Sequence, residues 1–226
     1  MKRALLLLLL SVSAIASARD DAPGFDLVSL QAEASREVSN DLMLAVLAVE
    51  MEDRDPAQLA DSVNRSIQEA LASAKEFKSV KVRSGTYRTY PVYDKNKFSH
   101  WRARHELRLE SRDFAAAARL IGKLQGALQL AGMEFKVAPD SRRKVENELI
   151  AEAIAAFNQR AEIVRAALKA GSYKLKEMNI GTSSAGVHQA FAASSAMRAA
   201  EAFAAPAVEA GSSEVSVNVS GTVKLE

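Results

Sequence analysis

Cysteine is absent from this chain of 226 residues, aromatic residues make up only 6% of it, and its net charge is small. Without cysteine, the chain can form no disulfide scaffold and perform no thiol peroxidase or disulfide exchange chemistry. The formal net charge of +2 gives no global case for nucleic-acid binding. With 48% hydrophobic and 26% charged residues, the composition is that of a globular protein, which excludes a chain disordered throughout.

Catalytic and metal-binding motifs are also missing. The chain contains no G-x-S-x-G, H-E-x-x-H or glycine-rich phosphate loop, so we expect no enzymatic activity and no cofactor. His100 and His105 lie five apart on an expected strand, so they point to opposite faces and do not share a metal, and His188 lies far from both. Glu50 and Glu52 do share a strand face, where a solvated rim is favoured over a general acid/base pair.

The first 18 residues have the pattern of a secretory signal peptide. A cationic start at residues 1–3 precedes the apolar run 4–15, and Ala16-Ser17-Ala18 is a small-x-small cleavage site. The apolar run is too short to span a bilayer, and no later run approaches 18 apolar residues. We therefore expect cleavage after Ala18, export to the periplasm and no transmembrane segment afterwards; association with the outer membrane is left open.

Side-chain periodicity predicts both strands and helices. Alternating or continuous apolar positions predict strands over residues 27–38, 41–51, 80–90, 101–110, 133–137, 173–180 and 215–225. Helical spacing predicts a helix that begins at Asp55-Pro56, a second over 114–128 and a third over 139–168. We also expect the first two strands to form a hairpin, Pro91 to end the third strand, a polar loop over 94–99, and a bulge near Lys176-Glu177.

The order of these elements, ββαββαβαβ with a last β, predicts an α+β fold. In this fold a largely antiparallel mixed sheet carries three amphipathic helices. Residues 19–181 form the main body, and the Ala- and Ser-rich segment 182–213 forms a linker or loop. Residues 214–226 form a closing strand that should return to pair with the sheet.

Several segments of the chain together resemble the SIMPL-domain family of bacterial exported proteins. They are Leu30 to Glu50 (LQAEASREVSNDLMLAVLAVE), Thr86 to Tyr93 (TYRTYPVY) followed by Trp101-Arg102-Ala103, Asp113 to Gly132, the Ala-rich stretch Glu148 to Gly171, and Glu214 to Leu225. That family includes periplasmic immunogenic proteins and oxidative-stress defence proteins. The resemblance implies a SIMPL-like α+β fold and a role in envelope integrity or stress tolerance, and it brings no catalytic residue set.

Charge is segregated along the chain. Residues 19–77 carry 5 basic and 13 acidic side chains, whereas residues 78–104 carry 8 basic and 1 acidic. The candidate surface combines basic and aromatic residues: Lys81, Arg83, Tyr87, Arg88, Tyr90, Tyr93, Lys95, Trp101, Arg102 and Arg104.

Three interpretations of this segregation stay open. The two charged segments are solvated or neutralise each other within one molecule; they bring copies together as a homo-oligomer; or the basic and aromatic region binds an anionic envelope polymer or lipid headgroup. Nucleic acid is the poorest partner for an exported protein. The favoured hypothesis is a non-enzymatic, self-associating periplasmic protein that supports envelope integrity or oxidative-stress tolerance. The alternative is a binding module for an anionic envelope component.

Overall fold

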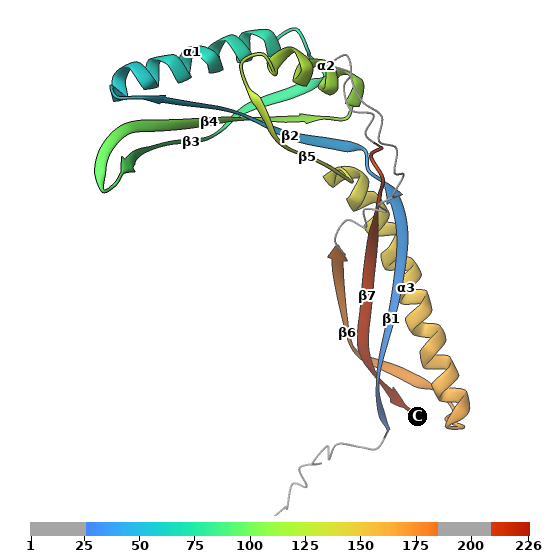
Figure 1. Ribbon diagram of the computed structural model, residues 1–226. Coiled ribbons are helices and arrows are strands. Elements are labelled where there is room, and N and C mark those ends of the chain that lie inside the picture. Colours follow the sequence, from blue (N-terminus) through green and yellow to red (C-terminus); the bar gives the residue numbers. More distant parts are fainter. Residues whose placement is uncertain (1–25, 185–208) are drawn as a thin grey trace, which may run out of the picture.

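The computed structural model describes residues 26–184 and 209–226, and it places them in two lobes (Figure 1). Each lobe has its own antiparallel sheet, with strand orders β3-β4-β2-β5 and β1-β7-β6. The elements are β1 (Leu27–Ser39), β2 (Leu42–Asp53), α1 (Pro56–Ala74), β3 (Val80–Asp94), β4 (Lys97–Ser111), α2 (Phe114–Leu124), β5 (Gln129–Lys136), α3 (Pro139–Ala167), β6 (Tyr173–Ser184) and β7 (Ser212–Leu225). The expected α+β class, with three helices packed on antiparallel strands, is confirmed.

The four-stranded lobe, β2 to β5 with α1 and α2, folds as its sequence pattern predicts. Asp55 caps α1, because its side chain accepts the backbone N–H of Ala57 at 2.8 Å, and Pro56 occupies the first turn. The stripe of Leu59, Val63 and Ile67 is at most 4% exposed. It packs with the inward residues of β2 and β4 into one core, so α1 and α2 cover a single face of this sheet.

The three-stranded lobe consists of β1, β6, β7 and α3. The alternating valines of β7, such as Val217 and Val219, are fully buried against Leu149 and Phe157 of α3. The terminal strand pairs with β1 on one side and β6 on the other, as expected for a closing strand. The predicted bulge is present, since the register with β7 shifts between Leu175 and Glu177.

The expected hairpin between the first two strands is wrong. β1 pairs with β7 over its whole length, whereas β2 pairs with β4 and β5 in the other sheet. A two-residue hairpin turn needs positive φ angles, which occur at Lys95 (46°) and Asn96 (65°) but at neither Ser39 nor Asn40. The chain therefore passes straight from one lobe to the other, and the two lobes extend in different directions from this junction (Figure 1).

The third strand and its loop also differ from expectation. Pro91 does not end β3, which continues to Asp94, because β3 is an edge strand and needs no ladder bond from every backbone nitrogen. The expected loop 94–99 is reduced to the turn at Lys95 and Asn96. β6 and β7 extend into both ends of the predicted linker 182–213, and its residues 185–208 lie outside the described part of the chain.

Candidate interaction surfaces

Each sheet has one face covered by helices and one face that we call open. On the four-stranded sheet, the open face is the one that points away from α1 and α2. Its side chains alternate along each strand with the residues of the core and lie next to one another across the strands. These are Leu44, Val46, Ala48, Glu50 and Glu52 of β2, Lys81, Arg83, Arg88 and Tyr90 of β3, His100, Arg102, Arg104, Glu106, Arg108 and Glu110 of β4, and Glu134 of β5. We name this surface the basic open face.

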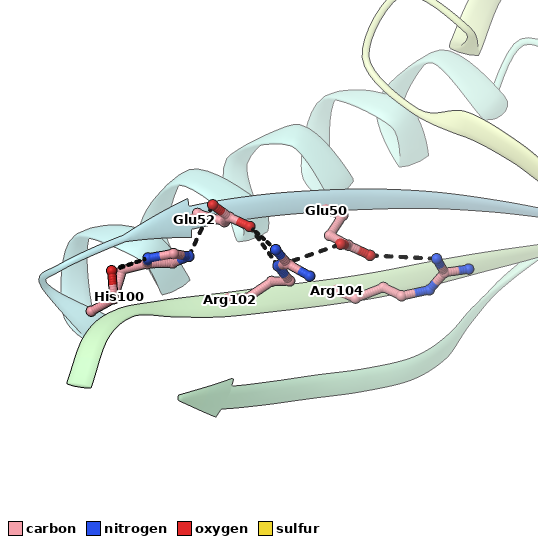
Figure 2. A network of polar contacts seen from close by, with 6 residues as sticks. Glu50, Glu52, His100, Arg102 and Arg104 are labelled. Atoms are coloured by element: carbon pink, nitrogen blue, oxygen red, sulfur yellow. Dashed lines mark hydrogen bonds and ion pairs between the residues drawn. The ribbon is translucent and has the colours of Figure 1, made fainter. Parts of the chain in front are cut away.

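A ladder of alternating charges crosses β2 and β4 on the basic open face (Figure 2). His100 Nε2 lies 3.0 Å from Glu52 Oε2, and the same carboxylate accepts a hydrogen bond from Arg102 Nε at 2.5 Å. Glu50 then lies between two guanidinium groups, 3.7 Å from Arg102 and 3.5 Å from Arg104. The pKa of Arg102 is raised above its ordinary value. The main cause is its hydrogen bond to Glu52, and the second is its contact with Tyr90.

This ladder shows how part of the acidic segment and part of the basic segment are arranged relative to each other. Glu50 and Glu52 belong to the acidic segment, and Arg102 and Arg104 belong to the basic one, so these four charges neutralise each other within one molecule. Both glutamates are held by arginines at partly exposed positions, with side chains 40% and 44% exposed.

The remaining cations of β3 are less well neutralised. Among the described residues, Arg83 and Arg88 have no acidic partner within ion-pair distance, whereas Lys81 lies 3.9 Å from Glu110. Arg83 lies directly across from Arg108 in the strand register, and like charges in that relation destabilise a sheet; Glu106, which lies 3.9 Å from Arg108, offsets part of this repulsion. Lys81, Arg83 and Arg108 line a hollow of about 570 Å³ together with two acidic side chains, Glu110 and Glu134, and apolar residues of β2.

The other predicted residues do not lie on this face. Tyr87 meets the partly buried His105 edge-on, with ring centroids 5.0 Å apart, on the side of the sheet that α1 covers. Trp101 shares that side and packs against the core of the four-stranded lobe. Tyr93 and Lys95 lie at the end of the β3–β4 hairpin. The ten predicted residues thus occupy three places rather than one patch.

The three-stranded sheet has an acidic open face on the side away from α3. It carries the acidic side chains Glu33, Glu37, Glu177 and Glu214, between small hydroxyl and amide residues of the same three strands, and the lysine pair Lys174 and Lys224 lies at its far end. Glu37 and Glu214 lie directly opposite each other, a second like-charge pair. Glu37 accepts a hydrogen bond from the hydroxyl of Ser212, and no described cation lies within ion-pair distance of these four glutamates.

The two described histidines point to opposite faces of β4, as expected. His100 belongs to the ladder, whereas His105 lies beneath Tyr87, and burial lowers the pKa of His105. Its Nδ1 is buried and has no hydrogen-bond partner among the described residues. Over residues 26–184 and 209–226, no three His, Asp or Glu side chains are placed to hold a metal ion.

Sequence reasoning missed three components of these surfaces. Phe98 falls in the segment predicted to be a polar loop, although its ring contacts the rings of both Tyr93 and Trp101. Arg108 continues the same alternation as Arg102 and Arg104, so extending the strand pattern would have found it. The pair of Glu37 and Glu214 joins the two ends of the described chain, and no local pattern reports such a contact.

The comparison with known families agrees with this architecture. The model of the SIMPL family, described as a protein of unknown function (DUF541), matches residues 28–223. The match spans both lobes, and the chain therefore belongs to the SIMPL family. No curated protein matches the chain. None of the helices in the described ranges has the length and apolar character needed to cross a membrane.

Proposed function

We propose that this SIMPL-family chain is an exported, non-enzymatic protein of the periplasm that self-associates and supports envelope integrity or tolerance of oxidative stress. The signal-peptide pattern of residues 1–18 supports export. The resemblance to exported stress-defence proteins supports the envelope role. Self-association is supported by the charges on the two open faces.

The observation that carries the proposal is that the chain has two like-charge pairs of opposite sign, one on each open face. Arg83 faces Arg108 on the basic open face, and Glu37 faces Glu214 on the acidic open face. Each like-charge pair weakens its own sheet when the face is in water, and on the basic open face Glu106 beside Arg108 offsets only part of the repulsion. Contact between the basic face of one copy and the acidic face of the next would place each pair beside opposite charges, which relieves both repulsions.

Such a contact is heterologous, because it joins two different surfaces of the same chain. Repetition of the contact gives a closed ring or an open chain of copies, depending on the rotation at each step. Charge attraction in this contact also predicts that assembly weakens as salt rises.

Light scattering on the purified mature chain tests self-association. At low salt we expect a mass several times that of the monomer, and in about 0.5 M salt a fall toward the monomer, because screening shortens the range of the attraction. A monomer at high protein concentration and low salt would overturn this part of the proposal.

Mixing two charge-reversed variants tests which faces meet. Glu37→Lys with Glu214→Lys leaves a chain with two basic faces, and Arg83→Glu with Arg108→Glu leaves a chain with two acidic faces. Each variant alone should stay monomeric, and an equimolar mixture should assemble again. The exposed pair Arg143→Glu with Lys144→Glu on α3 is the matched control and should assemble as the original chain does. Assembly of either variant alone would exclude these faces.

Export and envelope function are tested separately from assembly. Mass spectrometry of the periplasmic fraction should find an N-terminus at Arg19, as cleavage after Ala18 requires. Deletion of the gene should lower survival under peroxide or detergent stress, and the original chain should restore it. An uncleaved protein in the cytoplasm, or unchanged survival, would contradict this part.

A second candidate function is supported by Arg83 and Arg88, which have no acidic partner among the described residues. Their guanidinium groups suit the anionic groups of an envelope polymer. Replacement of both by glutamate should release the protein from immobilised lipopolysaccharide. Unchanged retention would exclude this function.

A further inference from the structure

The β3–β4 hairpin extends beyond the rest of its sheet. Pairing between β2 and β4 ends at Asp53 and Trp101, whereas β3 and β4 stay paired to their turn at Lys95 and Asn96. We call residues 92–100 the hairpin tip. Beyond the contact of His100 with Glu52 of β2, its two strands are supported by each other and by the rings at their base, and Figure 1 shows the tip curving away at one end of the four-stranded lobe.

The hairpin tip exposes large aromatic side chains. Tyr93 is 62% exposed and Phe98 is 49% exposed. Their ring centroids lie 6.2 Å apart, and Phe98 lies 5.6 Å from Trp101, which packs against the buried core. The three rings form a continuous apolar path from the core to the end of the hairpin, so the exposed rings are held in place rather than free to turn.

Basic side chains surround these rings. Arg54, Lys95 and Lys97 line a hollow of about 630 Å³ together with Phe98, and the single acid in its lining is Asp94. Among the described residues, none of the three cations has an acidic partner within ion-pair distance. The surface is therefore apolar at its centre and positively charged at its rim.

We propose that the hairpin tip docks on the surface of a lipid bilayer that contains anionic lipids. Aromatic rings prefer the boundary between headgroups and acyl chains, and lysine side chains near that boundary are attracted to anionic headgroups. A soluble polyanion would satisfy the three cations but would leave Tyr93 and Phe98 in water, so the rings favour a bilayer. This inference goes beyond self-association, because it uses neither of the two faces proposed to join copies.

The chain carries its own reporter for this contact, because Trp101 is its single tryptophan and touches Phe98. The mature chain is titrated with vesicles of phosphatidylcholine, with or without phosphatidylglycerol. Vesicles that contain phosphatidylglycerol should bind the protein, and brominated acyl chains should quench Trp101 emission. Vesicles of phosphatidylcholine alone should bind at least about tenfold more weakly. No binding to the anionic vesicles, or binding without quenching, would overturn the proposal.

Matched variants separate the rings from the charges. Tyr93→Ser with Phe98→Ser should abolish quenching, whereas the exposed apolar control on α3, Ile163→Ser with Leu168→Ser, should leave it unchanged. Lys95→Glu with Lys97→Glu should weaken vesicle binding about tenfold or more at low salt. The charge control Arg143→Glu with Lys144→Glu should change it less than twofold.

The same measurements distinguish this site from the open faces. Loss of vesicle binding in the Arg83→Glu, Arg88→Glu variant with full binding in both tip variants would overturn the proposal and assign the contact to the basic open face. Light scattering on the tip variants shows whether self-association persists. Membrane docking and assembly can therefore fail independently, and each failure is visible.

Discussion

Asp41 bonds to Ser141, which lies in the first turn of a helix that begins almost a hundred residues later in the chain. Its Oδ2 accepts the hydroxyl of Ser141 at 2.6 Å, and its Oδ1 accepts the backbone N–H of Ala138 at 2.6 Å. The residue that precedes α3, Ala138, offers no side-chain cap of its own. One carboxylate at the start of the four-stranded lobe therefore holds the residue that precedes α3 and a hydroxyl group of its first turn, which ties the two lobes together at their junction.

Replacement of Asp41 by alanine should destabilise the protein by about 1–3 kcal/mol, because it removes the charged acceptor of two hydrogen bonds. Thermal unfolding measures the change, and Asp61→Ala on the outer surface of α1 is the matched control, with an effect near zero. An equal loss in both variants would show that these two hydrogen bonds contribute nothing beyond the effect of removing a surface charge.

The contribution of Asp41 to folding stability should depend on pH. Burial alone raises the pKa of Asp41, but the hydrogen bonds from Ser141 and Ala138 outweigh burial and lower it overall. A lowered folded-state pKa means that the stabilisation is complete above the pKa of an unfolded aspartate and is lost as the pH falls through the folded-state pKa. The stability difference between the original chain and Asp41→Asn should therefore shrink below about pH 4. A difference that stays constant there would contradict the role of the charge.

The secondary structure could be predicted from the sequence, and the pairing of the first two strands could not. Alternation gave the faces of β1 and β7, and the cap at Asp55 gave the start of α1. The connection between β1 and β2, at Asn40 and Asp41, is as short as a hairpin turn, but neither residue has the positive φ angle that such a turn needs. Periodicity reports which face of a strand is buried, but it does not report which strand lies beside it.

Because each lobe has its own core, we expect a destabilising substitution in one lobe to leave the stability of the other lobe unchanged. Leu107 and Leu149 are both fully buried, one in each core, so truncation of each to alanine removes the same atoms at a cost of about 2–5 kcal/mol. By amide hydrogen exchange, Leu107→Ala should speed exchange in β2 and β4, and Leu149→Ala should speed it in β1 and β7. Equal acceleration across both lobes in both variants would instead indicate one cooperative unit.

Replacement of Gly221 by any larger residue should produce a steric clash at the bulge of β6. A Cβ atom on this residue would lie 2.5 Å from the carbonyl oxygen of Glu177 and 3.1 Å from the ring of Phe157. Gly221→Ala should therefore cost about 1–3 kcal/mol, because the backbone oxygen cannot move aside. Gly181→Ala in β6 is the control, since a Cβ atom there meets no atom within 4 Å. Equal stability of the two variants, measured by denaturant unfolding, would show that the strands separate to accept the methyl group.

The candidate surfaces were only partly predictable, for a physical reason. All ten candidate residues lie on the β3–β4 hairpin, but the alternation of each strand divides them between two faces and the tip. Counting the charges in a stretch of sequence does not take into account which face of the strand each side chain occupies. Tyr87 and Arg88 were therefore placed in one surface, although they point in opposite directions. The partners Glu50 and Glu52 come from β2, and the sequence gives no register between β2 and β4.

His105 predicts a loss of stability in mild acid. Burial lowers its pKa, and its buried Nδ1 has no hydrogen-bond partner among the described residues, so the folded state favours the neutral ring. An unfolded histidine binds its proton at about pH 6.5, and the folded one does so only at lower pH. Stability should therefore fall as the pH drops through this window, because the unfolded state binds more protons there. In His105→Phe, which keeps a ring beside Tyr87, the melting temperature should fall less between about pH 7.5 and pH 5 than in the original chain. An identical fall in both proteins would show that His105 is not the group responsible.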